Sequence, residues 1–350
     1  MWSDKFQKKI IWYVRTKYGI YPALARLYRS TKRKIRIYRR ATGTFVDLLN
    51  VLRFMRWDKH KTSYWRLSSE LVFQYHKIEK GLCIGGTRRF FGADAADETL
   101  KLLEEWKACG FSCKDPLYIG CMEALQAYLQ RLNVTPPSIS THPNLRKKIL
   151  SALEGYIPVP INSTPLFHSI SNSTSLQSMR ALAIERRSVR WFEKRPVGRD
   201  ILIEAIKIAQ LAPSACNRQP WRVHAYEGRD AIDSMLSLQN GNSGFGHRIP
   251  LLLIICADAR SFFDGTERHE PYLDSGLFLM TLILALQASG LASCCLNWCV
   301  ESGVDRKGHR IGNIPDNEVI ITYLAVGYST EGALVARSPR RDVNSVIEFH

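Results

Sequence analysis

The spacing of apolar residues predicts a mixture of helices and strands in the second half of this 350-residue chain. In residues 201–209, Ile, Leu and Ala recur at the intervals of one helical face. Residues 221–226 alternate as a half-buried strand does, and residues 250–257 form the continuous apolar run of a buried strand. The same patterns predict a short helix at 230–238 and further strands at 292–298 and 319–326.

The strongest apolar stretch of the chain, residues 276–296, is nearly long enough to span a bilayer. Polar or small residues interrupt it at Gln287, Ser289 and Gly290, which argues against a membrane span. Residues 272–287 are apolar nearly all round the helical circumference. This pattern predicts a helix that is buried on more than one side.

The first half of the chain reads as helical, and its composition changes along its length. Residues 1–66 are basic and aromatic, with a dense cationic block at 32–40 and an amphipathic stretch at 45–57. Residues 98–106 have helical periodicity, whereas prolines and Ser/Thr/Asn-rich sequence break up the stretch from 131 to 178. We therefore expect a helical arm at 1–66, a small helical domain and linker at 67–165, and a larger domain at 175–350.

The formal net charge of +17 is concentrated in the arm, where 18 Lys or Arg side chains stand against Asp4, Asp47 and Asp58. Three interpretations stay open. The arm packs on the main domain as a solvated helix, or it lies on an anionic membrane surface, where each Lys or Arg adds about 1 kcal/mol. Nucleic-acid binding is the third, and it is disfavoured because no recognised nucleic-acid module is present.

The nine cysteines form no pattern typical of a metal site. Cys294, Cys295 and Cys299 lie close in sequence, but no Cys-x-x-Cys motif repeats and no pair of histidines stands nearby. We therefore predict no metal centre and a reduced, cytoplasmic protein. In the membrane interpretation of the arm, the protein is peripheral on the inner face of a membrane. No secretory signal is visible at the N-terminus.

Two short motifs separated by one predicted helix carry the strongest chemical signal. Arg186, Ser188 and Arg190 stand at alternate positions, which places three hydrogen-bond donors on one side of a short segment. After the helix, Pro-Ser-Ala-Cys-Asn-Arg-Gln-Pro-Trp runs from Pro213 to Trp221. This order resembles the start of the nitroreductase family of FMN-dependent oxidoreductases, which reads Arg-x-Ser-x-Arg, helix, Pro-Ser-x-x-Asn-x-Gln-Pro-Trp.

The resemblance covers residues 178–350 and implies an α+β, nitroreductase-like fold, with a mostly antiparallel sheet flanked by helices. It implies that residues 276–296 are a buried helix followed by a strand, and that the helix packs against its twofold mate in an obligate homodimer. Gly327-Tyr328 is similar to the family's Val-Gly-Tyr signature, and the tail around Arg340 is similar to its Lys-Pro-Arg-Arg ending. Ser338 departs from that pattern, because the family commonly has lysine there.

The resemblance also implies which residues hold the cofactor FMN. Arg186, Ser188 and Arg340 match the positions that grip the phosphate, whose oxygens guanidinium groups can hold bidentately. Arg190 matches a basic residue beside the N1 and O2 edge of the flavin, and residues 213–217 match a loop that reaches FMN from the partner subunit. The implied contacts are Arg186, Arg187, Ser188, Arg190, Pro213, Ser214, Ala215, Asn217, Cys295, Leu296, Asn297, Trp298, Ser338 and Arg340.

No side chain is predicted to be catalytic, because the resemblance implies that the reduced flavin itself delivers hydride from its N5 atom. The backbone at Asn297 and Trp298 is implied to lie near N5. Many family members have a Glu-Gly pair where this chain has Asn297-Trp298. A tryptophan at this position is large enough to cover the ring face on which nicotinamide or substrate stacks.

The implied activity is ping-pong, two-electron chemistry, in which NAD(P)H reduces FMN and an electron-poor organic small molecule reoxidises it. Two alternatives stay open. Residues 76–82, His-Lys-Ile-Glu-Lys-Gly-Leu, with a Phe-Gly pair downstream, are similar to N-terminal extensions on nitroreductase-like proteins linked to bacterial surface-polysaccharide genes. This favours either a flavin-dependent tailoring enzyme for a glycan precursor or a non-catalytic partner in polysaccharide biosynthesis whose flavin face is blocked.

Overall fold

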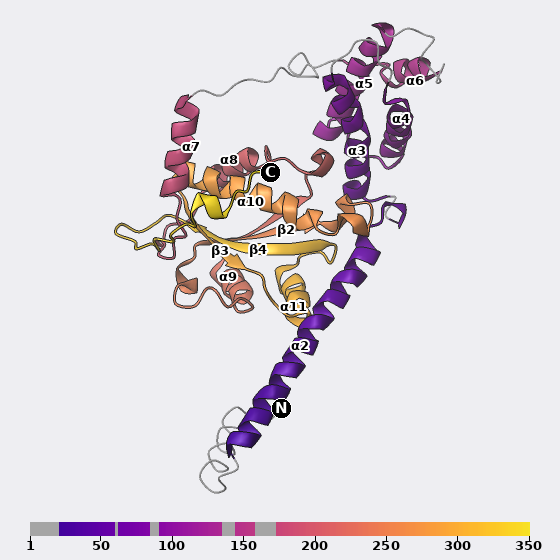
Figure 1. Cartoon of the computed structure of the whole chain (residues 1–350). Coiled ribbons are helices and arrows are strands. Elements are labelled where there is room, and N and C mark those ends of the chain that lie inside the picture. Colours follow the sequence, from indigo (N-terminus) through magenta and orange to yellow (C-terminus); the bar gives the residue numbers. More distant parts are fainter. Residues whose placement is uncertain (1–20, 60–61, 85–90, 135–143, 158–172) are drawn as a thin grey trace.

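The computed structural model describes residues 21–59, 62–84, 91–134, 144–157 and 173–350. Within these residues, a four-stranded sheet and its helices form the C-terminal domain, a group of helices forms a second unit, and one long helix projects from the body (Figure 1). The elements before the sheet are α2 (Tyr21–Phe54), η1 (Trp57–Lys59), α3 (Tyr64–Cys83), α4 (Ala93–Ala108), α5 (Pro116–Val134), α6 (Leu145–Ala152), α7 (Ser173–Glu185), α8 (Arg199–Ala209) and η3 (Ala215–Asn217).

The sheet has the order β1-β2-β4-β3, and every neighbouring pair of strands is antiparallel. Strand β2 is buried along its whole length, as its continuous apolar sequence requires, whereas β1 is only half-buried at the edge. The elements from the sheet onward are β1 (Trp221–Tyr226), α9 (Arg229–Leu236), η4 (Gly246–Arg248), β2 (Leu251–Asp258), η5 (Ala259–Ser261), η6 (Gly265–Glu267), α10 (Glu270–Ala288), β3 (Ala292–Asn297), α11 (Ser302–Gly312), β4 (Glu318–Gly327) and η7 (Val343–Ser345).

Helices cover both faces of the sheet (Figure 1). On one face α8 and α10 pack against Leu253, Ile255 and other alternate residues of the strands. On the other face α9 packs with Tyr323 and Leu296 into a second apolar cluster. The alternation of strand side chains between two separate clusters makes this a layered α+β domain, as the sequence predicts.

Helix α10 has the length and hydropathy of a membrane span, yet it packs here as the core helix of the domain. Phe278, Leu282 and Leu286 are completely buried against the sheet and α8. The opposite side exposes Leu273, Leu277 and neighbouring apolar residues. The predicted helix and strand at 276–296 are therefore confirmed, but burial on more than one side is not found within a single chain.

The helical unit has a core of its own, in which α3, α4, α5 and α6 enclose Trp106 and Tyr128. The motif at residues 76–82 has a structural use in this unit. Gly81 lies against the Phe91 ring, so closely that an added Cβ would fall 2.1 Å from it, and Gly92 takes the left-handed conformation that begins α4. The Tyr128 hydroxyl donates a hydrogen bond to the Phe91 carbonyl oxygen. These contacts give Gly81 and Gly92 a structural role in the helical unit.

The predicted strands and helices of the C-terminal domain are found within one or two residues of their expected ends. Helix α7 differs, because it begins at Ser173, inside the stretch of Ser, Thr and Asn that the sequence places in the linker. The predicted arm is helical from Tyr21 to Phe54. Its first 20 residues, and most of the boundary predicted between 165 and 175, lie outside the described residues.

A glycine at the end of β4 tests how tightly segment 188–193 packs on the sheet. A Cβ on Gly327 would lie 2.6 Å from Pro250 Cγ and 2.9 Å from Phe192 Cδ1. We expect Gly327→Ala to lower the free energy of unfolding by about 1–3 kcal/mol in urea titrations. Gly303→Ala on α11 is the matched control, since no atom lies within 4 Å of its added Cβ. Equal stability of the two variants would contradict the packing described.

Candidate functional site

The segment that follows α7 is fixed to the edge strand β3 by its backbone. Ser188 forms a parallel bridge with Ser293, and the Val189 amide donates a 3.1 Å hydrogen bond to the Ser293 carbonyl oxygen. Further along, Phe192 bridges Ser329 in the antiparallel sense. Arg186, Arg187, Ser188 and Arg190 therefore lie beside β3, at the edge of the sheet far from β1.

Arginines of this segment influence the pKa values of two thiols on β3. Partial desolvation by the surrounding protein and the neighbouring Cys294 raise the pKa of the Cys295 thiol to about 11, although the residue is exposed, and the charge of Arg186 opposes that rise. Burial also raises the pKa of Cys294, against the charge of Arg190. A pocket of about 250 Å³ lies next to them, lined by Arg187, Glu185, Gln287, Ser329 and Val335 among others. Cationic side chains, neutral thiols and an open pocket thus meet at one edge.

The end of β3 is oriented by Gln239, a residue that the sequence analysis did not single out. The buried Gln239 amide donates a 2.9 Å hydrogen bond from Nε2 to the Asn297 carbonyl oxygen. Its Oε1 accepts from the Gly241 amide at 2.5 Å. The only sequence signal near it is the loop rich in Gly and Asn that follows, which marks a turn but not a hydrogen bond to a distant strand.

The Trp298 side chain turns toward α11. Its indole Nε1 donates a 2.7 Å hydrogen bond to Asp305 Oδ1, and its ring stacks on Tyr323 at 4.6 Å between centroids. Cys295 and Asn297 are exposed, and by strand alternation they lie on the other face of β3. The Trp298 ring therefore does not cover the face that carries Cys295 and Asn297.

The loop from Pro213 to Gln219 lies before β1, in an unusual backbone conformation. Cys216, Asn217 and Gln219 all have positive φ, at 49°, 57° and 51°. Three non-glycine residues in the left-handed region within four positions store backbone strain that the surroundings must hold. The Ser214 hydroxyl accepts a 3.0 Å hydrogen bond from the Gln219 amide, which closes the loop from inside.

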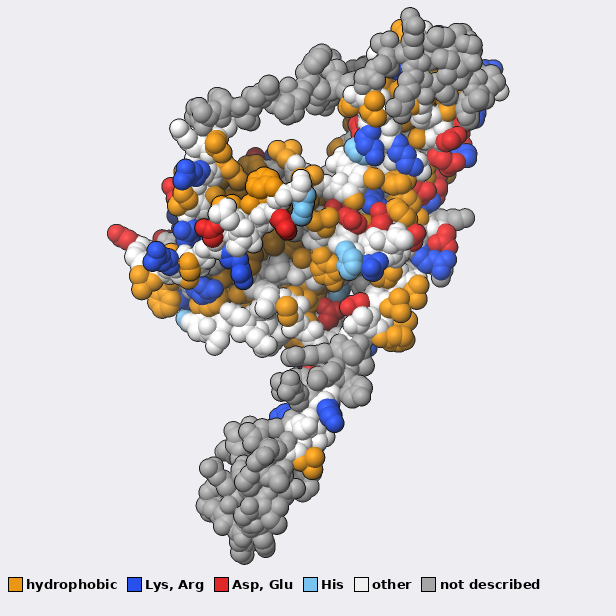
Figure 2. Space-filling view, viewed as in Figure 1, with side chains coloured by type: hydrophobic (Ala, Val, Ile, Leu, Met, Phe, Trp, Pro, Cys, Tyr) orange, Lys and Arg blue, Asp and Glu red, His pale blue; other side chains and the backbone are white. Residues whose placement is uncertain are grey.

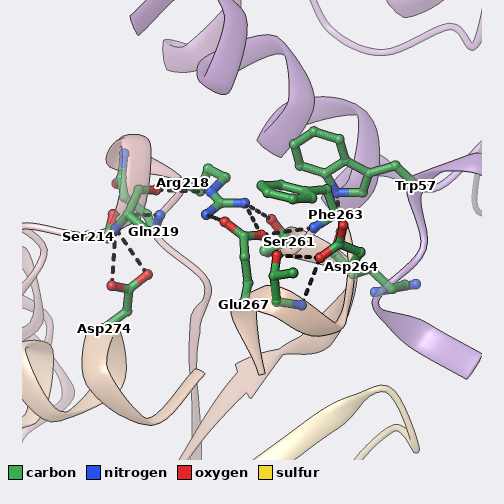
Figure 3. Close-up of polar contacts among 12 residues, drawn as sticks. Trp57, Ser214, Arg218, Gln219, Ser261, Phe263, Asp264, Glu267 and Asp274 are labelled. Atoms are coloured by element: carbon green, nitrogen blue, oxygen red, sulfur yellow. Dashed lines mark hydrogen bonds and ion pairs between the residues drawn. The ribbon is translucent and has the colours of Figure 1, made fainter. Parts of the chain in front are cut away.

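Arg218 holds the same loop to the body of the protein (Figure 3). Its side chain is 0% exposed and forms a bidentate pair with Glu267, at 2.8 and 2.5 Å. The guanidinium also donates to the Ser261 and Ala215 carbonyl oxygens, both at 3.0 Å. Its remaining surface faces the rings of Trp57, Phe73, Phe262 and Phe263. A buried charge with this many partners fixes the loop's position.

Asp274 on α10 holds the other side of the loop. Its two carboxylate oxygens accept the Ala215 amide hydrogen at 3.0 and 3.2 Å, and its side chain is buried. Burial raises the pKa of Asp274 to about 6, and the hydrogen bond from Ala215 opposes that rise. Arg218, Glu267 and Asp274 were missed by sequence reasoning, because partners about 50 residues apart leave no local signal.

The C-terminal tail carries the last two predicted contacts. Arg340 is exposed, and its Nη1 donates to the Ser338 carbonyl oxygen at 2.5 Å. Ser338 has a φ of 48°. Val335 of the same tail lines the pocket beside Arg187. The tail thus approaches the β3 edge, while the Arg340 guanidinium has no acidic partner among the described hydrogen bonds.

One chain does not bring all of the predicted residues together. The group at 186–190 and the residues Cys295, Leu296, Asn297 and Trp298 share the β3 edge. Pro213, Ser214, Ala215 and Asn217 lie beside β1, with β2 and β4 between the two groups. The resemblance assigns that loop to the partner's cofactor, and a single chain leaves this assignment a prediction.

His224, Cys256 and Glu318 are a group of possible metal ligands within the described part of the chain, with their ligand atoms no more than 4.8 Å apart. His224 Nε2 already lies 2.6 Å from Glu318 Oε2, and Arg222 Nε lies 3.4 Å from Oε1. The guanidinium thus supplies the positive charge that a cation would bring. We interpret this group as an ion-pair cluster across β1, β2 and β4.

The geometry and the sequence comparisons lead to the same family. A family model described as "Nitroreductase family" matches residues 183–238 and 232–328. An NADH dehydrogenase of Thermus thermophilus is 36% identical over 186 residues, which cover 43% of this chain and 87% of that protein. A 4-nitrobenzoate reductase of Pseudomonas putida is 27% identical, over 48% of this chain and 94% of that protein. The chain belongs to the nitroreductase family of oxidoreductases.

Solved structures are similar over about half of the chain. An FMN-dependent nitroreductase of Clostridium difficile matches 49% of this chain and 98% of its own, at 20% identity and a TM-score of 0.42.

Removing the buried guanidinium tests whether Arg218 holds the loop. We expect Arg218→Met to lower the free energy of unfolding by about 3–5 kcal/mol, because Glu267 is left with an unmatched buried charge. The control Arg199→Ala breaks an exposed pair with Glu227 and should cost less than about 1 kcal/mol. Arg218→Met/Glu267→Leu should recover part of the loss in urea titrations. A double variant as unstable as the single one would rule out the unmatched charge as the cause.

The raised pKa of Asp274 gives a pH dependence with a defined sign. The folded state binds the Asp274 proton more tightly than the unfolded state, whose pKa is near the ordinary 3.8. The stability contribution is therefore present below 3.8 and lost as pH rises through about 6, by up to about 3 kcal/mol. Asp274→Asn keeps an acceptor for Ala215 but does not titrate. The wild type should lose stability relative to this variant between pH 4 and 7, and a pH-independent difference would contradict the assignment.

Proposed function

We propose that this protein is a homodimeric, FMN-dependent oxidoreductase that takes two electrons from NADH or NADPH and passes them to an electron-poor organic acceptor. Family membership supports the reaction class. The relatives named as a reductase and an NADH dehydrogenase are consistent with it. The observation that carries the proposal is the attachment of Arg186 and Ser188 to β3 through the Ser188–Ser293 bridge.

The donor set beside β3 fits the phosphate of FMN. Arg186 and Ser188 supply a guanidinium group and a hydroxyl from alternate positions, while Arg187 between them donates to the carbonyl oxygens of Ile184 and Arg186. Such donors suit a dianionic phosphate, and each charged hydrogen bond contributes about 1.5–3 kcal/mol. Arg340 would complete this set from the tail that passes the same edge. When bound, FMN supplies the ring that holds the two electrons between the half-reactions.

The rest of the site would position and shield the flavin ring. The Arg190 guanidinium offsets negative charge that develops on the ring edge. Gln239 holds the Asn297 carbonyl oxygen, so the end of β3 presents a fixed backbone. The raised pKa values of Cys294 and Cys295 keep both thiols protonated and neutral at physiological pH. With Trp298 turned to α11, the exposed face of β3 stays open to a substrate, which favours an enzyme over a non-catalytic partner.

The apolar surface that one chain leaves exposed supports the proposed dimer. Tyr272, Leu273, Leu277 and Met280 present apolar surface along α10. Hydrophobic side chains gather over α8 and α10 in Figure 2. A second copy packed on this face would bury that surface, and it would bring the loop of residues 213–219 to the β3 edge of its partner. The two halves of the predicted cofactor site would then meet.

The test is the flavin content of the purified full chain. We expect a yellow dimer whose flavin is reduced anaerobically by NADH or NADPH and reoxidised by a nitroaromatic acceptor. Arg186→Ala should weaken FMN binding by about 10- to 100-fold, the equivalent of one lost charged hydrogen bond. Arg199→Ala is the matched control, because Arg199 forms its exposed pair with Glu227, which follows β1 at the opposite edge of the sheet.

Three outcomes would overturn parts of this proposal. A colourless monomer would refute both the cofactor and the dimer. Equal FMN affinity in the Arg186→Ala and control variants would refute the phosphate assignment. A yellow dimer that neither nicotinamide reduces would refute the electron donor and favour the alternative of a tailoring enzyme with another reductant.

A further inference from the structure

We propose that helix α2 is a membrane-surface helix that docks this protein on anionic lipid. The helix has 34 residues, so it is about 50 Å long. Near its C-terminal end α2 contacts the body: Phe54 packs with Phe262, Val51 lies beside Gly265, and the helix approaches α11. The N-terminal part of the helix stands away from the domain in Figure 1.

Toward its C-terminal end, α2 exposes a row of apolar side chains. Phe45, Leu48, Leu49 and Leu52, here named the outward stripe, are 48–61% exposed. Their spacing of three, four and seven residues places them on one helical face. Phe54, which packs on the body, lies on the other side of the helix, and the half-buried Val51 lies between the two sides. Leu27 stands 18 residues before Phe45, which is five full turns and therefore the same face, and it is 64% exposed.

The positive charge of α2 indicates what kind of partner the helix binds. Within residues 21–54, nine Lys or Arg residues stand against the single acid Asp47. Two copies of such a helix would repel each other, so the outward stripe is not suited to pairing with a second α2. A nucleic acid would match the cations but offers no apolar surface for the stripe. An anionic bilayer offers both, since apolar side chains enter the headgroup region while Lys and Arg stems reach its phosphates.

The proposal is independent of the flavin chemistry. It needs an exposed apolar stripe on a cationic helix, and both are properties of α2 alone. Lys32 and Lys34 are exposed within the cationic block, so they are available to lipid headgroups. Because screening by salt weakens such attraction but not apolar insertion, both parts of the surface can be tested separately.

The experiment is cosedimentation of the full-length protein with vesicles. We expect binding to phosphatidylcholine vesicles that contain about one-third phosphatidylglycerol, and at least about tenfold weaker binding to phosphatidylcholine alone. Leu48→Glu/Leu52→Glu should weaken binding at least about tenfold. Lys32→Glu/Lys34→Glu should weaken it too, and high salt should reduce this difference.

The control is Leu150→Glu, which changes a 51% exposed leucine on α6 in the helical unit and should leave vesicle binding unchanged. Circular dichroism and flavin content report whether each variant folds. The proposal is overturned if the wild type does not bind anionic vesicles, or if the stripe variant binds as well as the control. It is also overturned if Leu48→Glu/Leu52→Glu changes only the oligomeric state. The same holds if Lys32→Glu/Lys34→Glu weakens only retention on duplex DNA.

Discussion

The burial of one positive charge, that of Arg218, constrains the arrangement of the whole molecule. A guanidinium that is 0% exposed must be matched by an acid and by carbonyl oxygens, and Glu267, Ser261 and Ala215 provide them. The aromatic rings around it come from both halves of the chain, with Trp57 and Phe73 on one side and Phe263 on the other. The N-terminal helices are thus joined to the C-terminal domain at the loop of residues 213–219.

Periodicity was enough to predict the strands and helices of the C-terminal domain, because burial on one face imposes a repeat that the sequence must carry, whereas the antiparallel sheet was implied by the family resemblance. Strand β2 and helix α9 were found in this way. The motif from Pro213 to Trp221 located the loop that precedes β1. The strained backbone of this loop, and the side chains that hold it in place, were not predictable. Arg218, Glu267 and Asp274 carry no periodic signal, since their contacts depend on how distant elements meet. The exposed side of α10 stays a predicted buried surface, because an apolar pattern does not say which molecule covers it.

The two groups of predicted cofactor residues lie at opposite edges of a four-stranded sheet. A rigid sheet cannot bring β1 and β3 together, so a site that uses both groups must be assembled from two chains. In the proposed dimer, this requirement would account for the firm anchoring of the loop. A loop that contributes to a partner's site gains no support from the site of its own chain. Without other support, residues in the left-handed conformation, such as Cys216 and Asn217, would relax to a less strained backbone. Arg218 and Asp274 supply that support from two sides.

The same anchoring also fixes the direction of α2. Trp57 follows the helix by three residues, donates a hydrogen bond to the Arg260 carbonyl oxygen and packs against Phe73 and Phe263. Tilting α2 would move Trp57 against Phe263. The backbone amide of Phe263 donates a hydrogen bond to Glu267, the same carboxylate that pairs with Arg218. The helix and the loop are therefore parts of one packed cluster. A surface that orients α2 orients the β1 edge with it, so the position of the arm determines how the candidate site faces that surface.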